Sequence, residues 1–186
     1  MLLRDFRDQL QYWLQMNRGG LLEPIPAGSG ICRIVNVDWS GYDPSFLSNR
    51  PGRWTVGDQA YRYFADDLPV CSAELGYFTD PVPPDRVVEL WQTTLEVPAV
   101  SVERLPAPLK MALYEDRGEP ALKWQKPRAL IEVIRNTAEY QDTHFIYAAS
   151  ASGLACDIGG MCLVAPATNA VERLQSMTYR EWENLR

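Results

Sequence analysis

Short apolar runs separated by proline- and glycine-rich breaks most constrain what this chain can fold into. The runs at 31–37, 59–65 and 87–97 are rich in β-branched or aromatic residues, which predicts strands. Apolar residues at helical spacing occur at the N-terminus and again after Pro127. Strands come first, and helices are interspersed without a regular βαβ alternation. The sequence therefore predicts an α+β fold.

The remaining segments complete the expected order of elements. We expect helices over 2–17, 68–77 and 143–152, a helix opening at Pro127, and a last helix capped by Thr178. Asp66 or Asp67 can cap the helix over 68–77. Further strands are expected at 100–104 and 161–164, a linker at 21–30, and a long loop at 38–52. Residues 105–126 show neither clear periodicity nor a motif.

The N-terminal helix has two interpretations. Its apolar stripe either packs on the helix's own domain or serves dimerisation or partner binding. We expect a division into an N-terminal helix with linker, residues 1–30, and a catalytic domain, residues 31–186. A chain of 186 residues is long enough for one domain with a substantial core.

Composition excludes several classes of function. The chain carries 24 acidic and 18 basic residues, a formal net charge of −6, and no cluster of lysine and arginine. It is therefore a poor candidate for direct binding of nucleic acid or an anionic membrane. The four cysteines form no CxxC pair and His144 is the single histidine, so no metal site is expected. Cys32, Cys71 and Cys162 lie in apolar runs, which predicts that they are buried.

The absence of export signals predicts a cytoplasmic protein. Charged residues interrupt any apolar region at the N-terminus, so no secretory pattern is present. No apolar stretch approaches the roughly 20 residues that span a bilayer. In that compartment the thiols are expected to be reduced.

Two arginines, a tyrosine and a glutamate are the candidates for chemistry. Arg33 lies among apolar neighbours in a strand, where it needs an anion such as phosphate, unless it reaches solvent along an edge. Arg53 follows a glycine and either approaches a ligand or stacks on Trp54. Glu74 lies between Ala73 and Leu75 in the otherwise apolar helix expected over 68–77 and needs a donor, which a ribose diol or an arginine supplies. Tyr63 is equally suited to a core position.

The order and spacing of four segments resemble the core signature of RES-domain proteins. The segments are Arg33, Gly52-Arg53-Trp54, Tyr63-Phe64-Ala65-Asp66 and Glu74. These proteins are toxins of bacterial toxin–antitoxin pairs, with a fold like that of ADP-ribosyltransferases and an activity that breaks down NAD⁺. The resemblance covers about residues 31–78, with a weaker echo over 140–166. The family places an aromatic beside the first arginine, where this chain has Cys32 and Ile34.

The resemblance implies a mixed β-sheet with an N-terminal helical extension, and a role for each motif residue. Glu74 would bind the ribose hydroxyls and face the developing cation. Arg33 and Arg53 would hold phosphate oxygens, or one of them an inorganic phosphate nucleophile. Tyr63 would contact the nicotinamide ribose. The hydroxyl of the family serine falls best on Thr143, with Ser150 and Ser152 as alternatives.

The resemblance also implies a reaction and a partner. The expected activity is cleavage of the nicotinamide–ribose bond of NAD⁺, first of all by phosphorolysis, with no other cofactor. Mono-ADP-ribosylation of a cellular protein is the near alternative. The alternative from another class is a non-catalytic nucleotide-binding or interaction module, in which Arg33 and Arg53 are ion-pair partners of Glu74. The expected partner is an antitoxin with a helix-turn-helix region. The sequence does not decide whether the chain also forms a homo-oligomer.

Two common enzyme classes do not fit the sequence. No GxGxxG turn follows a strand, which argues against a dinucleotide-binding dehydrogenase. No serine lies in a GxSxG turn, so a serine hydrolase is not indicated.

Overall fold

The computed structural model describes residues 1–35, 54, 61–74, 81–115, 124–141, 143, 145–149, 161–166 and 170–186. Its strands are β1 (Leu22–Ile25), β2 (Gly30–Val35), β3 (Tyr61–Ala65), β4 (Val87–Thr93), β5 (Val97–Ser101), β6 (Phe145–Ala149), β7 (Met161–Pro166) and β8 (Val171–Thr178). Its α-helices are α1 (Leu3–Met16), α2 (Leu68–Glu74), α3 (Ala107–Tyr114), α4 (Gln125–Arg135) and α6 (Tyr179–Asn184). Two 3₁₀ helices, η3 (Val102–Arg104) and η4 (Ala138–Tyr140), lie between them.

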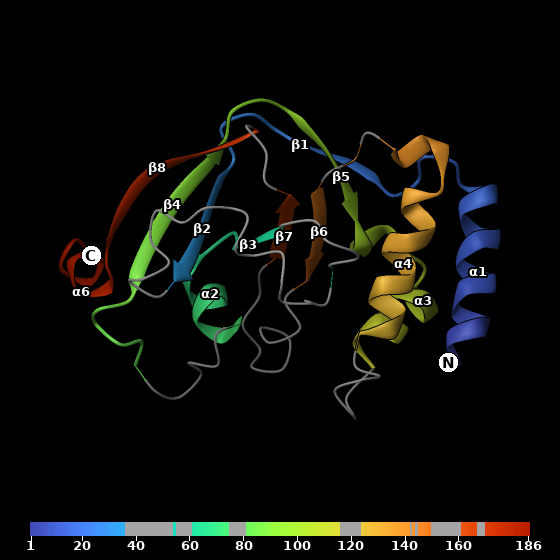
Figure 1. Ribbon diagram of the computed structural model, residues 1–186, viewed down its shortest axis with the longest axis horizontal. Coiled ribbons are helices and arrows are strands. Elements are labelled where there is room, and N and C mark those ends of the chain that lie inside the picture. The colour runs from blue at the N-terminus through green and yellow to red at the C-terminus, as the bar shows by residue number, and fades with distance from the viewer. Residues whose placement is uncertain are drawn as a thin grey trace.

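The described strands form one sheet in the order β1-β5-β6-β7-β3-β2-β4-β8. The pair β5/β6 is parallel and the other pairs are antiparallel, so the fold is α+β with a mixed sheet. Figure 1 shows α1, α3 and α4 side by side near β5 and β6, whereas α6 lies beyond β8 at the opposite end. None of the helices in the described ranges is long and apolar enough to cross a membrane.

Helices α2 and α4 cover the same face of the sheet. Cys32 pairs with Ala65, and both pack against residues of α2. Ala65 pairs with Cys162, which pairs in turn with Ala148, and Ala148 packs in the cluster that contains the buried face of α4. Because paired residues project to one side of a sheet, these contacts define a helix face.

The opposite side of the sheet, the helix-free face, has a core of its own. Its buried residues come from strands at both ends of the strand order, namely Ile31, Phe64, Trp91, Val97, Ala99, Phe145 and Val171. The sheet must therefore curl so that its ends approach each other. Two hydrogen bonds support this: the Thr93 hydroxyl donates to the Pro26 carbonyl (2.6 Å) and the Gly28 N–H donates to the Thr93 carbonyl (2.8 Å). Gly28 has a positive φ of 78°, which glycine adopts without strain.

Helix α1 packs on its own domain. Phe6, Leu10 and Leu14 are buried on one side of the helix, at the spacing that the sequence shows. They join a cluster with Leu130 and Ile134 of α4. Of the two interpretations of the N-terminal stripe, the structure supports packing within the domain for these three residues.

Several expectations from the sequence are wrong. The run over 87–97 is not one strand, because β4 ends at Thr93 and β5 begins at Val97, and the strand expected over 100–104 ends at Ser101, where η3 follows. Residues 21–30 are not merely a linker, because Leu22–Ile25 forms β1 and pairs with β5. The helix expected over 143–152 is wrong for Phe145–Ala149, which is strand β6, hydrogen-bonded to β5 and β7. A central strand covered on both faces is a short continuous apolar run, and periodicity cannot separate such a run from a buried helix.

Other local expectations are confirmed. The Asp67 carboxylate caps α2 by accepting from the Val70 N–H at 2.9 Å. Thr178 caps α6 in a capping box with Glu181. Cys32 and Cys71 are buried, and their sulfurs lie 3.4 Å apart between β2 and α2. The burial of Cys162 lies outside what the structure describes.

Replacing Phe6 with alanine is expected to lower the free energy of unfolding by about 3–5 kcal/mol, because the side chain is fully buried. Urea unfolding followed by circular dichroism measures this. Tyr12→Ala is the matched control, since Tyr12 is 67% exposed on the same helix, and its effect should stay within about 0.5 kcal/mol. Equal effects of the two substitutions would contradict the packing of α1 in the core.

Candidate functional site

Arg33 lies on the helix-free face and pairs with a buried carboxylate. In the register of β2 with β4, Arg33 stands directly opposite Glu89. The Arg33 Nε donates to Glu89 Oε2 at 2.6 Å; 11% of the Arg33 side chain is exposed and none of Glu89. This contact uses Nε, so the two terminal nitrogens of the guanidinium remain outside this ion pair.

Glu89 also accepts from two further donors. Arg173 of β8 donates to Oε1 at 2.9 Å, and the Trp91 indole N–H donates to Oε2 at 3.1 Å. Burial alone raises the pKa of Glu89, but the positive charge of Arg33 and the hydrogen bonds from Arg33, Arg173 and Trp91 outweigh it and lower the pKa. The carboxylate is therefore ionised and satisfied within the protein.

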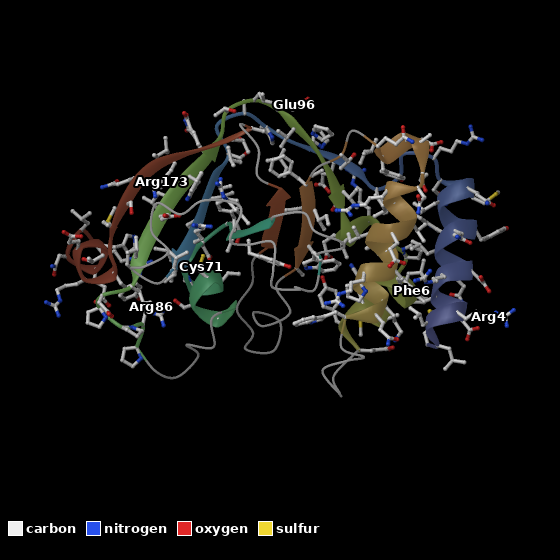
Figure 2. All side chains as sticks on the ribbon, viewed as in Figure 1. Arg4, Phe6, Cys71, Arg86, Glu96 and Arg173 are labelled. Carbon is white, nitrogen blue, oxygen red and sulfur yellow. The ribbon has the colours of Figure 1, made fainter. Side chains whose placement is uncertain are left out.

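A third arginine lies beside this ion pair. The guanidinium of Arg62, on β3, lies over the Trp91 ring at 5.0 Å from its centroid, and that of Arg33 lies 5.7 Å from the same centroid. Burial lowers the pKa of Arg62, and the positive charges of Arg33 and Arg173 lower it further. The negative charge of Glu89 acts in the opposite direction, but the pKa remains below its usual value. We call Arg33, Arg62, Arg173, Glu89 and Trp91 the arginine cluster. It contains three guanidinium groups and one carboxylate, of which Arg33 and Arg173 are paired with Glu89 and Arg62 lies over the Trp91 ring. Figure 2 labels Arg173 on β8.

Tyr63 lies on the other side of the sheet from Arg33. It is two residues from Ala65, which faces α2, whereas Arg62 and Phe64 face the helix-free side with Arg33. The Tyr63 side chain is 39% exposed, and its hydroxyl accepts from the Trp54 N–H at 3.4 Å. One small ligand group therefore cannot contact both Arg33 and Tyr63.

The other sequence candidates are placed only in part. Glu74 is the last residue of α2, on the helix face, and only its backbone is described. Thr143 lies between η4 and β6, half-buried, with its N–H donating to the Tyr140 carbonyl at 3.0 Å. It precedes a strand rather than opening a helix. Arg53, Ser150 and Ser152 lie outside the described residues, and the roles of all the candidates stay predictions.

Sequence reasoning missed most of the arginine cluster. Glu89 is a carboxylate within the apolar run Val87–Trp91, and such a residue signals a buried partner. Arg62 could have been assigned to the face of Arg33 by alternation once the pairing of β2 with β3 was known. Arg173 carried no signal, because the polar stretch of β8 does not read as a strand.

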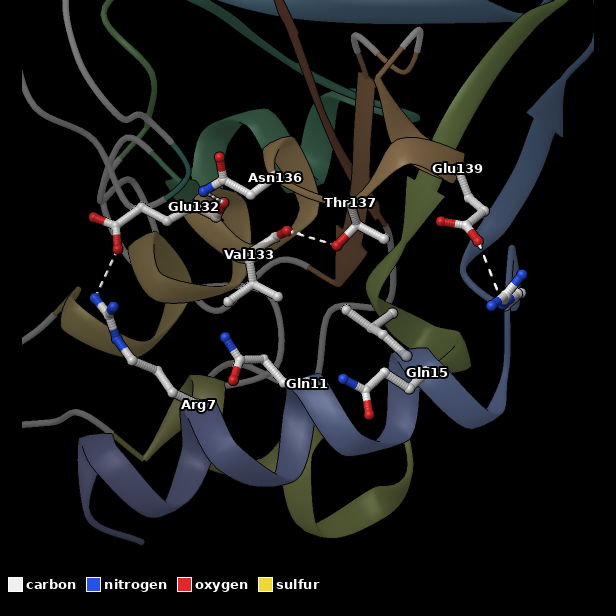
Figure 3. Close-up of a pocket in the computed structure, with 10 residues that line it drawn as sticks. Arg7, Gln11, Gln15, Glu132, Val133, Asn136, Thr137 and Glu139 are labelled. Carbon is white, nitrogen blue, oxygen red and sulfur yellow. Dashed lines mark hydrogen bonds and ion pairs between the residues drawn. The ribbon is translucent and has the colours of Figure 1, made fainter.

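A groove with a volume of about 610 Å³ lies between α1 and α4. Figure 3 shows Arg7 from α1 paired with Glu132 from α4 at 2.6 Å, and Thr137 donating to the Val133 carbonyl at 2.8 Å. A second ion pair joins Arg18 and Glu139 across 3.7 Å. The charges compensate each other, and none of the candidate residues lines the groove.

A smaller cavity of about 210 Å³ opens between β1 and β2. Its walls include Ile25, Ile31, Asp66 and Tyr147. Ile31 belongs to the buried core of the helix-free face, and Ile25 and Tyr147 pack against that core. Among the residues that the structure describes, no group of histidine, cysteine, aspartate and glutamate is arranged to hold a metal ion.

Comparison with known proteins identifies the fold. No family model matches the sequence, and no curated protein sequence matches it. Among solved structures, the chain is similar to one in the crystal structure of the M. tuberculosis MbcT–MbcA toxin–antitoxin complex, with a TM-score of 0.58 and 14% identity. The alignment covers 100% of this chain and 99% of that chain. This chain has the fold of a component of a toxin–antitoxin complex.

Glu89→Gln is expected to lower the free energy of unfolding by about 3 kcal/mol near neutral pH, because Arg33 and Arg173 lose their buried countercharge. The folded-state pKa of Glu89 is depressed, so its contribution is full above the unfolded-state value near 4.5 and is lost as pH falls through the folded-state value. The difference between the wild type and the variant should therefore shrink at acidic pH.

Urea unfolding at a series of pH values tests this. Glu172→Gln is the matched control on β8, because Glu172 is exposed and pairs with Gln92 at the surface. A Glu89 effect that matches the control, or that grows as pH falls, would contradict the arrangement of the ion pairs.

Proposed function

We propose that this chain is the toxin of a toxin–antitoxin pair and that it cleaves the nicotinamide–ribose bond of NAD⁺. The observation that carries the toxin role is the fold, which matches a chain of a toxin–antitoxin complex over the whole length of both chains. The choice of NAD⁺ rests on the ordered motif Arg33, Arg53, Tyr63 and Glu74, which resembles that of RES-domain proteins.

The proposed reaction needs orientation and electrostatic stabilisation more than proton transfer. The bond between the ribose carbon and the nicotinamide nitrogen breaks, and its electron pair leaves with a neutral nicotinamide. The ribose passes through an oxocarbenium-like cation, as in glycoside hydrolysis. Inorganic phosphate then forms a new bond at that carbon and gives ADP-ribose 1″-phosphate. A carboxylate near the cation lowers the barrier.

The proposed roles are those that the motif residues have in the resemblance to RES-domain proteins. Glu74 stabilises the ribosyl cation and binds the ribose hydroxyls, with Tyr63 from the same face beside the ribose. Thr143, or Ser150 in its place, orients the nicotinamide end or the nucleophile. Arg33, together with Arg53, supplies positive charge to phosphate oxygens. The ion pair of Arg33 with Glu89 uses Nε, so within the described residues it leaves the terminal nitrogens outside that contact, which supports this role for Arg33.

One observation favours a second candidate, a non-catalytic interaction module. The Arg33 side chain is already paired with Glu89 at 2.6 Å, a partner different from the Glu74 that the sequence offered. In that case Arg33 stabilises the contact of β2 with β4, and the chain acts only by binding.

The proposed partner is an antitoxin protein that covers the NAD⁺ site and carries a helix-turn-helix region. The likeness to a chain of a toxin–antitoxin complex supports a protein partner. The DNA-binding part is assigned to the partner, because this acidic chain has no cluster of basic residues suited to DNA.

Glu74→Gln is expected to slow nicotinamide release from NAD⁺ about 100-fold or more, since one charge that stabilises the transition state is removed. The measurement is chromatographic quantification of nicotinamide released by the purified chain. Glu96→Gln is the control, because Glu96 is an exposed glutamate in the turn between β4 and β5 (Figure 2). Wild-type turnover in a folded Glu74→Gln variant would reject this residue as catalytic. No turnover by the wild type would favour the interaction module.

A further inference from the structure

Two buried cysteines from distant parts of the chain bring their sulfur atoms into contact. Cys32 lies on β2 and Cys71 on α2, 39 residues apart in sequence, and the two sulfurs are 3.4 Å apart. An S–S bond is about 2.05 Å long, so the sulfurs touch without being bonded to each other. The pair therefore lies at the contact between a strand and the helix that covers it, where a bond between the sulfurs would join the two elements.

Hydrogen bonds to the sheet hold both sulfurs near this position. The Cys71 thiol donates to the Cys32 carbonyl at 3.3 Å, and the Cys32 thiol donates to the Ala65 carbonyl at 3.5 Å. Because Cys32 and Ala65 pair across β2 and β3, both acceptors belong to the same part of the sheet. Bond formation then requires the sulfurs to approach by about 1.4 Å, which small rotations of two unbranched side chains supply.

Burial among apolar residues is by itself the ordinary state of a core cysteine. The cluster around this pair includes Leu68, Val70 and Val88. Two features distinguish the pair from ordinary core residues. Each sulfur has the other as a neighbour, and neither residue is fully enclosed, because Cys32 is 5% and Cys71 6% exposed whereas Val70 and Val88 are 0% exposed. Helix α2 has seven residues, so a local opening of this short helix exposes Cys71 further.

We infer that Cys32 and Cys71 form a redox modification site, at which hydrogen peroxide converts the two thiols into a disulfide between β2 and α2. One sulfur attacks the O–O bond of the peroxide, so that an S–O bond forms and the first water leaves. The second sulfur then attacks the first. The S–S bond forms, the S–O bond breaks, and the two thiol protons leave with the oxygens as water. The two sulfurs lose two electrons in total, and the peroxide gains them.

The bond would restrain α2 and stabilise the folded chain. It closes the segment between Cys32 and Cys71 into a loop, which reduces the conformational freedom of the unfolded state. Glu74, the last residue of α2, follows Cys71 by three residues, so the last turn of the helix is held against β2. Formation of the disulfide requires no turnover of NAD⁺, and the site stands or falls independently of the proposed reaction.

Peptide mapping of the full chain after treatment with hydrogen peroxide tests the bond. Remaining thiols are alkylated in denaturant before digestion with trypsin. Cleavage after arginine and lysine places Cys32 in peptide 19–33, Cys71 in peptide 63–86, and the other two cysteines together in peptide 136–173. We expect peptide 19–33 linked to peptide 63–86. Dithiothreitol should separate the two peptides, because a disulfide is reduced by thiols whereas sulfinic and sulfonic acids are not.

Cys71→Ala should abolish the linked peptide, whereas Cys162→Ala, which removes a cysteine from β7, is the matched control and should keep it. Urea unfolding is the second measurement. Peroxide should raise the urea midpoint of the wild type by about 1 M and should not raise that of Cys71→Ala. The variant also controls for oxidation of methionine, which peroxide causes in both chains. Circular dichroism verifies that both variants are folded.

Three results would overturn the inference. The first is an oxidised wild type in which peptides 19–33 and 63–86 are not linked to each other, or in which either is linked to peptide 136–173 instead. The second is an equal loss of the linked peptide in Cys162→Ala and Cys71→Ala. The third is a urea midpoint of the oxidised wild type that does not exceed that of the reduced wild type.

Discussion

The buried carboxylate of Glu89 forms the ion pairs on which the helix-free face of this fold depends. It stands on β4 and binds arginines from the strands on either side, Arg33 from β2 and Arg173 from β8. A carboxylate with no exposed surface is stable only with such partners. The pairing therefore fixes which way Arg33 points, and it directs Arg33 away from the helices. The register of β2 with β3 and with β4 also places Arg62 and Trp91 on the same face of the sheet as Arg33.

The curled sheet consequently divides its chemistry between two faces. The helix face carries Tyr63 and is covered by α2, which ends at Glu74. The helix-free face carries the arginine cluster and an apolar core that includes Phe64 and Trp91. A small ligand such as phosphate is confined to one face.

The sequence was informative where the physics is local. The stripe of α1, the Asp67 cap and the Thr178 capping box depend on neighbouring residues, and the structure has all three. Strand β6 was mistaken for a helix because partners distant in sequence make it a central strand. Arg33 was recognised as an anomaly, but its partner Glu89 depends on the register of two strands, which no local pattern states. Of the arginine cluster, the sequence therefore predicts Arg33 alone, and without its partner Glu89.

Product analysis after incubation of the purified chain with NAD⁺, with and without inorganic phosphate, tests the central claim most directly. The account predicts release of nicotinamide that requires phosphate, together with ADP-ribose 1″-phosphate as the second product. Nicotinamide release with free ADP-ribose, equal in both conditions, would contradict phosphorolysis. NAD⁺ that stays intact in both conditions would contradict the proposed activity altogether.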